Sequence, residues 1–186
     1  MKLLPLLLTS LAFASTAAQT NQIAIPPKAE RGRADADCRV PETGPAFRVE
    51  VKGLKDRTGG LVLELYPATD ADFLAPDKKL IAAGKPFRRV PVTVPAHGPI
   101  TLCIRAPASG RYAVSLLHDR DRNGKFGFLK DGIGFSGNPK LGMQKPSAAS
   151  ASAQVGNTVE TLQIVMNYRQ GFSMKPLQLA ERDQRP

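Results

Sequence analysis

The amino-acid sequence predicts an all-β protein, a single antiparallel β-sandwich of about seven strands with one long loop. Apolar and polar residues alternate in several short segments, which is the pattern of strands that bury one face. Turns containing glycine and proline separate these segments at the spacing typical of sandwiches, and no segment has the periodicity of a long helix. The sequence contains no recognisable internal repeat.

The start of the chain has the composition of a secretory signal peptide. A positively charged beginning is followed by an apolar run over residues 3–14 and by small residues at 15–18. The run is too short to span a bilayer stably, which favours a cleaved signal over a buried helix. We expect residues 1–18 to be removed by cleavage after Ala18, with Ala14 as the alternative site. The expected location is the periplasm or the medium.

One domain is expected after the signal. Residues 19–40 are polar and charged and predict a flexible N-terminal segment, because they offer too little apolar surface to offset the entropy of ordering. The sandwich domain is predicted over residues 41–170, a length sufficient for one core. The polar residues 171–186 predict a C-terminal tail.

The strands are predicted in the following order. Residues 47–54 alternate apolar and charged side chains, and residues 61–66 are more apolar, as expected for a central strand. A turn with a glycine pair separates them, so these two strands are expected to form a hairpin. Further strands are predicted over residues 87–94, 100–105, 111–117, 149–155 and 160–168.

Two local features add detail to this order of strands. Pro91 lacks an N–H group and predicts that the third strand lies at a sheet edge. Residues 69–74 are expected to form one helical turn that tucks Phe73 and Leu74 under the sheet.

The cysteine count predicts a disulfide. The chain has two cysteines, Cys38 and Cys103, and an even count in an exported chain favours pairing. The bridge would tie the N-terminal segment to a strand. Two free thiols or a shared metal are the alternatives, but only His97 and His118 could complete a soft-metal site.

The formal net charge is +10, which could attract nucleic acid, phospholipid headgroups or anionic glycans. The basic residues are scattered, however, and the chain has no tryptophan for stacking on bases. The scattered positions of the basic residues favour a solvated basic surface. The predicted export of the protein argues against a nucleic-acid partner. No segment after the signal is long and apolar enough to span a membrane.

The most informative segment is the long loop that begins at His118. Asp119, Asp121 and Asn123 stand at alternate positions and are followed by glycine, as in the first half of a calcium-binding loop. In that arrangement the carbonyl of Lys125 would be a further ligand, and Asp131 or water would complete the shell.

The alternative interpretation is a metal-free loop. The twelfth position, where a bidentate glutamate is expected, is Lys130. Aspartate and asparagine side chains also accept hydrogen bonds from nearby backbone N–H groups and build tight turns without metal. The missing glutamate favours this interpretation, and Ca²⁺ is retained as a possible cofactor.

Catalytic residues are not assigned. His118 and Asp119 would face opposite sides of a strand, and Ser115 and Ser136 lack the sequence context of a nucleophile elbow. A pair of loop carboxylates could serve acid–base hydrolysis, which leaves a small envelope hydrolase as an alternative function.

Three phenylalanines in the loop region have two interpretations. Phe126, Phe128 and Phe135 could line a ligand groove, or they could fold back as a small core for the loop itself. We expect the second arrangement.

Three motifs in order resemble domain of unknown function family 2141. They are Gly-Arg-Tyr-Ala-Val at residues 110–114, His-Asp-Arg-Asp-Arg-Asn-Gly-Lys at 118–125 and Gly-Ile-Gly-Phe-Ser-Gly-Asn-Pro at 132–139. The resemblance covers roughly residues 38–168 and implies an exported bacterial sandwich of immunoglobulin-like or prealbumin-like shape. It implies no activity. Gly127 and Gly137 depart from the family pattern, which often has an acidic residue and asparagine there.

The leading hypothesis is therefore a non-enzymatic binding or structural module of the bacterial envelope, with an unknown partner or ligand. Its binding surface is expected on the long loop over residues 119–146, because binding residues on a rigid scaffold are concentrated in loops. A calcium-binding sandwich module is the second hypothesis, and the envelope hydrolase is the third.

Overall fold

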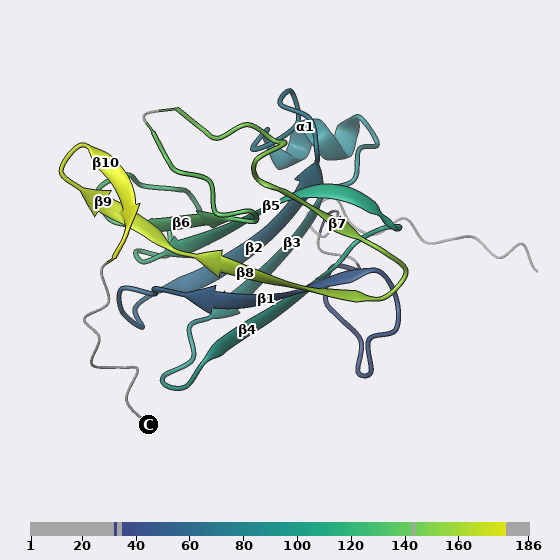
Figure 1. The fold of residues 1–186 in the computed structure, drawn as a ribbon, viewed down its shortest axis with the longest axis horizontal. Coiled ribbons are helices and arrows are strands. Elements are labelled where there is room, and N and C mark those ends of the chain that lie inside the picture. The colour runs from purple at the N-terminus through teal and green to yellow at the C-terminus, as the bar shows by residue number, and fades with distance from the viewer. Residues whose placement is uncertain (1–31, 33–34, 143, 178–186) are drawn as a thin grey trace, which may run out of the picture.

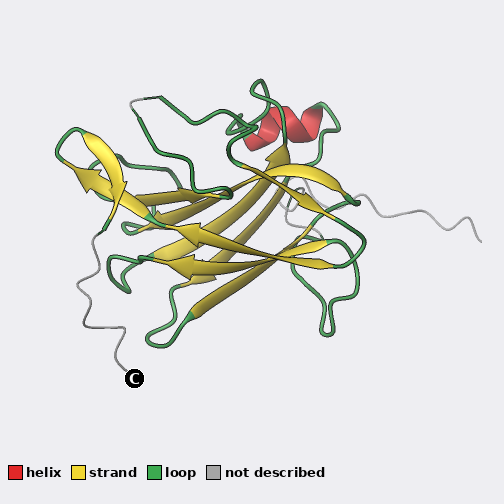
Figure 2. Cartoon of the chain, viewed as in Figure 1, coloured by secondary structure: helices red, strands yellow, loops and turns green. Residues whose placement is uncertain are grey.

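The computed structural model describes residue 32, residues 35–142 and residues 144–177. The predicted signal peptide and signal cleavage site lie outside the described residues. In the described part of the chain, ten strands form two sheets, and the only helix is short (Figure 2). This confirms the predicted all-β sandwich and increases the number of strands. No helix among the described residues is long and apolar enough to cross a membrane.

The smaller sheet has three strands in the order β4-β1-β8. Their bounds are β1 Ala46–Lys52, β4 Ile100–Arg105 and β8 Val159–Val165. Strand β1 pairs antiparallel with β4 and parallel with β8, so the sandwich is not antiparallel throughout.

The larger sheet has the order β10-β9-β6-β5-β2-β3, and β7 also pairs with β5 (Figure 1). Its strands are β2 Gly60–Pro67, β3 Arg88–Thr93, β5 Gly110–Asp119, β6 Gly132–Phe135, β7 Ser152–Val155, β9 Asn167–Gln170 and β10 Ser173–Pro176. The proline-containing strand β3 lies at the sheet edge, as predicted.

The expected hairpin between the first two strands does not form, since β1 and β2 belong to different sheets. Both edges of β1 are already taken by β4 and β8, which leaves no edge for β2. The connector instead crosses between the sheets, with positive φ angles at Gly53 (68°) and Gly59 (80°) that other residues adopt only with strain.

Two apolar clusters hold the layers together. The main core lies between the sheets and includes Phe47, Leu63, Leu116 and Ile164. A second cluster lies on the outer face of the larger sheet, below helix α1 (Asp77–Ala82), and includes Phe73 and Phe135. Strand β5 is therefore buried on both faces, which explains its nearly continuous apolar sequence.

The helical turn before α1 forms as expected. The Phe73 N–H donates to the Thr69 carbonyl at 2.9 Å, and the Thr69 hydroxyl donates to Asp72. Phe73 is fully buried, whereas Leu74 remains half-buried and lines a cavity described below.

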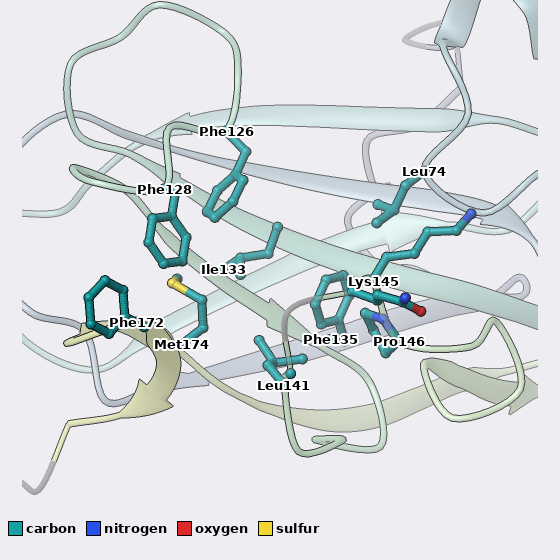
Figure 3. Close-up of a pocket in the computed structure, with 12 residues that line it drawn as sticks. Leu74, Phe126, Phe128, Ile133, Phe135, Leu141, Lys145, Pro146, Phe172 and Met174 are labelled. Carbon is teal, nitrogen blue, oxygen red and sulfur yellow. The ribbon is translucent and has the colours of Figure 1, made fainter.

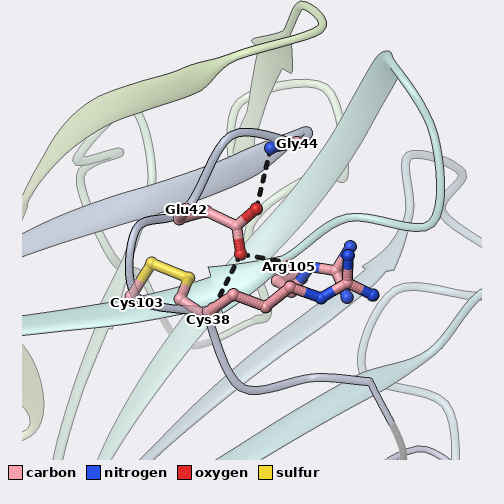
Figure 4. Close-up of a disulfide and its surroundings, with 6 residues drawn as sticks. Cys38, Glu42, Gly44, Cys103 and Arg105 are labelled. Atoms are coloured by element: carbon pink, nitrogen blue, oxygen red, sulfur yellow. Dashed lines mark hydrogen bonds and ion pairs between the residues drawn. A yellow bond between two sulfur atoms is a disulfide. The ribbon is translucent and has the colours of Figure 1, made fainter.

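Part of the expected flexible segment is ordered against the sandwich. Cys38 and Cys103 form the predicted disulfide, with Cα atoms 5.8 Å apart (Figure 4). Ala36 is fully buried, and its carbonyl accepts the N–H of Arg105 at the edge of β4. The carbonyl of Gly32 similarly accepts the N–H of Arg89 in β3. The segment thus follows the edges of both sheets.

A carboxylate fixes the chain next to the disulfide (Figure 4). Glu42 accepts the N–H groups of Arg39 and Gly44 and pairs with Arg105 at 3.1 Å. The two backbone hydrogen bonds, helped by Arg105, hold the pKa of Glu42 below its usual range.

The predicted C-terminal tail also contains regular structure. Residues 173–176 form β10, which pairs with β9, and the single strand predicted over residues 160–168 is divided into β8 and β9 at Met166. Residues 178–186 lie outside the described part of the chain.

Candidate functional site

The long loop leaves β5 at Asp119 and is organised around that side chain. Its carboxylate accepts the N–H of Asn123 at 3.1 Å and the N–H of Gly124 at 2.8 Å. Asp119 is buried, at the position where strand β5 ends. The turn predicted from the Asp-x-Asp-x-Asn-Gly spacing is thus built by side-chain to backbone hydrogen bonds.

Strand β6 lies within the long loop predicted over residues 119–146 and divides it, because β5 and β9 pair with these residues on both sides. Asp131 closes the first part of the loop, just before β6. Only 1% of its surface is exposed, and its carboxylate accepts the N–H of Arg120 at 2.9 Å and that of Gly127 at 2.7 Å. The two buried carboxylates therefore hold both ends of this part of the loop in place.

The other predicted ligands lie near the exposed surface. The Asp121 carboxylate accepts the Asn123 N–H at 3.3 Å and pairs with the Lys130 ammonium at 3.2 Å. Slight desolvation would raise the pKa of Asp121, but Lys130 and the Asn123 N–H outweigh it and lower the pKa. The Asn123 side-chain oxygen accepts the N–H of Lys125 at 2.8 Å.

The structure brings three of the five predicted metal ligands together. Oxygens of Asp119, Asp121 and Asp131 lie within 4.8 Å of one another. Asn123 turns its oxygen back to the loop backbone, and Lys125 follows at an exposed position. Each carboxylate oxygen has a second lone pair, so the hydrogen-bonded loop and cation binding are chemically compatible.

His118 is the residue before the loop and is completely buried. Its Nε2 lies 2.7 Å from the carbonyl of Thr58, which can only accept, so Nε2 carries the proton. Its Nδ1 accepts the hydroxyl of Tyr168 at 2.7 Å, and that hydroxyl accepts the N–H of Lys55. His118 thus links the end of β5 to the β1–β2 connector and to β9.

This environment makes His118 an acid-sensitive element of the fold. Burial lowers the pKa of His118, and hydrogen bonding to Thr58 and the charge of Asp56 oppose that shift without cancelling it. Arg120 lowers the pKa further, and Asp131 raises it. The buried, hydrogen-bonded ring is therefore held in its neutral form.

We expect the free energy of unfolding to fall as the pH decreases from about 6.5, the unfolded-state pKa of histidine, towards the lower folded-state pKa. Between these two pKa values His118 is protonated in the unfolded chain but neutral in the folded chain. The contribution of the neutral ring to the free energy of unfolding is therefore fully present above this pH range and is lost as the pH falls through it. Urea unfolding of wild type and His118→Gln at several pH values measures this dependence. The exposed His97 provides the control: His97→Gln should retain the wild-type dependence.

An apolar pocket lies where the long loop meets the β9–β10 hairpin (Figure 3). It has a volume of about 270 Å³ and is lined by Leu74, Phe126, Phe128, Ile133, Phe135, Leu141, Gly142, Gln144, Lys145, Pro146, Phe172 and Met174. The expected small core of the loop does not form: Phe135 lies in β6, is buried in the second cluster against Phe73 and also lines the pocket. Phe126 and Phe128 do not fold back into a core of the loop, since 43% and 41% of their surfaces are exposed.

A second, larger cavity of about 740 Å³ lies over the outer face of β2, β3 and β5. Leu74, Phe126 and Ile133 line both cavities, so the two adjoin and form one cleft. One part of the cleft is apolar, and the other has polar and charged residues on its floor.

The polar floor is an ion-pair network centred on Glu64. Arg89 contacts Glu64 at 2.6 Å and Asp77 at 2.7 Å, and the Tyr66 hydroxyl donates to Glu64 at 2.6 Å. Ser115 lies 3.4 Å from the same carboxylate. Burial and the neighbouring negative charge of Glu64 raise the pKa of Tyr66, so its hydroxyl stays protonated and acts as a donor.

The third sequence motif has a structural role. The Ser136 hydroxyl is buried and donates to the Ala151 carbonyl, so it is not available as a nucleophile. The Asn138 side chain donates to the Gln163 carbonyl at 2.9 Å and accepts the Val165 N–H at 2.8 Å. It therefore pairs with the outer edge of β8 as a strand backbone would.

Sequence reasoning did not find the floor of the cleft. Glu64, Arg89 and Asp77 come from two strands and a helix, and no spacing in the sequence relates them. An indirect signal was present at Glu64, a single charge within an otherwise apolar strand. Phe172 and Met174 belong to the hairpin that sequence reasoning assigned to the tail.

The fold and the site define a class of protein, a small β-sandwich with a loop-built cleft on the outer face of its larger sheet. The chain belongs to a bacterial family described as uncharacterized protein conserved in bacteria, domain of unknown function family 2141, whose sequence model matches residues 49–163. No curated protein and no solved structure matches the chain.

Proposed function

We propose that this protein is a non-enzymatic binding module of the bacterial envelope that holds a small amphipathic molecule in its cleft. The observation that carries the proposal is the junction of an apolar pocket with a polar-floored cavity across Leu74, Phe126 and Ile133. Binding sites for small molecules are typically concave and largely apolar, with a few polar groups that orient the ligand.

A non-enzymatic role is supported by the state of the reactive side chains. His118 is buried with both ring nitrogens engaged, and the Ser136 hydroxyl is bound to a carbonyl. Glu64 is paired with Arg89 and Tyr66. None of these groups is free to act on a molecule in the cleft without first breaking a buried hydrogen bond.

An envelope location is supported by two independent features. The N-terminal sequence has the pattern of a cleaved signal. The Cys38–Cys103 disulfide is of the kind that persists in the periplasm or outside the cell, where thiols are not kept reduced.

Binding of a fluorescent amphipathic probe tests the proposed function. We expect 1-anilinonaphthalene-8-sulfonate to bind the wild type and decanol to displace it. Ile133→Trp fills the junction of the two cavities and should lower probe binding at least about fivefold, as loss of an apolar contact of this size allows. Val40→Trp, at a fully exposed site outside the cleft, should bind as wild type.

Phe126→Ala provides a second test that removes a cleft wall instead of filling the cleft. It should also weaken probe binding, and its exposed position makes a folding defect smaller than for Ile133. Probe binding at the wild-type level in both cleft variants, with unchanged thermal melting, would disprove the proposed site.

Calcium binding by the loop is the second candidate function. It is favoured by the grouping of the Asp119, Asp121 and Asp131 oxygens within 4.8 Å. A bound Ca²⁺ would neutralise this concentrated negative charge and fix the loop that carries Phe126. In this role the metal stabilises the cleft and is not itself the ligand.

Thermal melting with Ca²⁺ tests this candidate. If Ca²⁺ is present at about tenfold its Kd, the expected stabilisation is about 1.4 kcal/mol, or roughly 5 °C for a domain of this size. Asp121→Ala should abolish the shift, and Asp37→Ala, an exposed acid outside the loop, should retain it. An unchanged wild-type melting temperature over millimolar Ca²⁺ excludes the metal role.

A further inference from the structure

Apolar side chains project from the edge of the molecule at which the cleft opens. Phe172 at the tip of the β9–β10 hairpin is 91% exposed, and Leu129 in the long loop is 74% exposed. Phe126 and Phe128 line the same pocket as Phe172 (Figure 3), and Leu129 follows Phe128 in the sequence. We call these four residues, Phe126, Phe128, Leu129 and Phe172, the apolar rim. Gathered apolar side chains of this size on a surface mark a contact with a partner or a membrane.

Exposed basic side chains lie on the segments that carry or neighbour the rim. Lys125, Lys130, Lys140, Arg169 and Lys175 come from the same loops and hairpin, and all are exposed. Acidic residues are fewer there: residues 132–177 contain only Glu160, and Asp119 and Asp131 in the long loop are buried. Asp121 is the exposed acid of that loop, and it pairs with Lys130 at 3.2 Å. Exposed basic residues therefore outnumber exposed acidic residues in the segments that carry the rim.

We propose that the apolar rim docks on an anionic phospholipid surface. Apolar tips that enter the headgroup region and a flanking ring of lysine and arginine are the two elements by which peripheral proteins hold such surfaces. A second copy of the chain is disfavoured as the occupant, because it would bring two basic surfaces together. The inference goes beyond the proposed function, since Leu129 protrudes at the rim but does not line the pocket.

Docking in this orientation has a consequence for the cleft. Phe126, Phe128 and Phe172 belong both to the rim and to the pocket lining. The mouth of the pocket would therefore face the lipid surface, from which an amphipathic molecule could enter without crossing water.

Vesicle cosedimentation tests the proposal. The full-length gene is expressed so that export and processing occur, and the purified protein is mixed with vesicles of phosphatidylethanolamine and phosphatidylglycerol. We expect binding that is strong at low salt, weakened by NaCl, and at least about tenfold weaker on phosphatidylcholine vesicles. Leu129→Ser with Phe172→Ser should lower binding at least about tenfold, because the apolar contact is removed.

Charge reversals separate local from overall electrostatics. Lys125→Glu with Lys175→Glu should lower vesicle binding at least about tenfold. Arg48→Glu, on the exposed face of β1 in the smaller sheet, should have a small effect. The wild type and all variants have the same N-terminus after processing. Differences in vesicle binding between them therefore arise from the substituted residues. Equal losses in the Arg48 variant and the rim variants would overturn the proposal.

Two further results would also overturn it. One is the absence of wild-type binding to anionic vesicles. The other is a wild-type dimer that the Leu129 and Phe172 substitutions dissociate while vesicle binding stays unchanged, which would assign the rim to a second copy. Leu129→Ser alone should leave probe binding in the cleft unchanged, so failure of membrane docking and failure of the proposed ligand site give different results.

Discussion

Replacing Cys38 and Cys103 together by serine is expected to lower the free energy of unfolding by about 4 kcal/mol. The bridge joins residues separated by 65 positions, and a loop of that length loses much conformational entropy when it is closed in the unfolded chain. The bridge also holds the segment whose Ala36 is buried in the main core. Urea unfolding of the oxidised wild type and the double variant measures the difference.

Reduction provides a matched control for this prediction. A reducing agent should destabilise the wild type by a similar amount and leave the double serine variant unchanged, because that variant has no bridge to lose. A difference between the oxidised wild type and the double variant of less than about 1 kcal/mol would contradict the entropic account.

The substitution Gly132→Ala is expected to destabilise the protein by about 3 kcal/mol or more. Gly132 lies opposite Tyr168 in the β6–β9 pair, and a methyl group there would overlap the tyrosine ring. The ring is buried in the core and its hydroxyl donates to His118, so it cannot move without losing that bond. The free-energy cost of overpacking and the cost of leaving the buried His118 without its hydrogen bond then add to each other.

Gly156→Ala is the comparison for this variant, because nothing lies within 4 Å of a methyl group at that position. Its stability should equal that of the wild type or slightly exceed it. Urea unfolding of both variants checks the prediction, and equal stability of the two would show that Tyr168 is not held in place. In that case Gly132, the first residue of the third motif, would need another explanation.

The strands of the sandwich could be predicted because their burial is local in the sequence. In β2, Leu61, Leu63 and Leu65 face the main core while Glu64 faces the cleft, and this alternation is readable directly. Strand β6 could not be predicted in the same way. It has four residues, two of them glycines, and it exists because β5 and β9 provide pairing on both sides.

The assignment of strands to sheets was likewise beyond sequence reasoning. A turn with two glycines is compatible with a hairpin and with a crossing between layers, and only the pairing of β1 with β4 and β8 decides between them. Those partners lie about fifty and about one hundred and ten positions further along the chain. Local preferences carry no information about such distant contacts.

For the candidate site, the acidic group was predictable and the cleft was not. Asp119 and Asp121 are close in sequence, and Asp131 follows them within the same loop, so the sequence indicated that these three side chains could meet. The cleft depends on Glu64 and Arg89, which meet through the pairing of β2 with β3. It depends equally on the conformation of the loop, which leaves Phe126 exposed at its wall.

The Asn138 amide, described above as a partner of β8, bears on how this protein behaves at high concentration. An outer strand with free N–H and carbonyl groups is a template on which another chain can add a strand. Asn138 occupies those groups at Gln163 and Val165, and the segment through Gly32 and Ala36 occupies parts of the edges of β3 and β4. These contacts disfavour strand-by-strand association of copies of the chain at the edges of β8, β3 and β4. Docking on a lipid surface, as proposed above, would raise the local concentration of the protein and make this occupation of the edges more important.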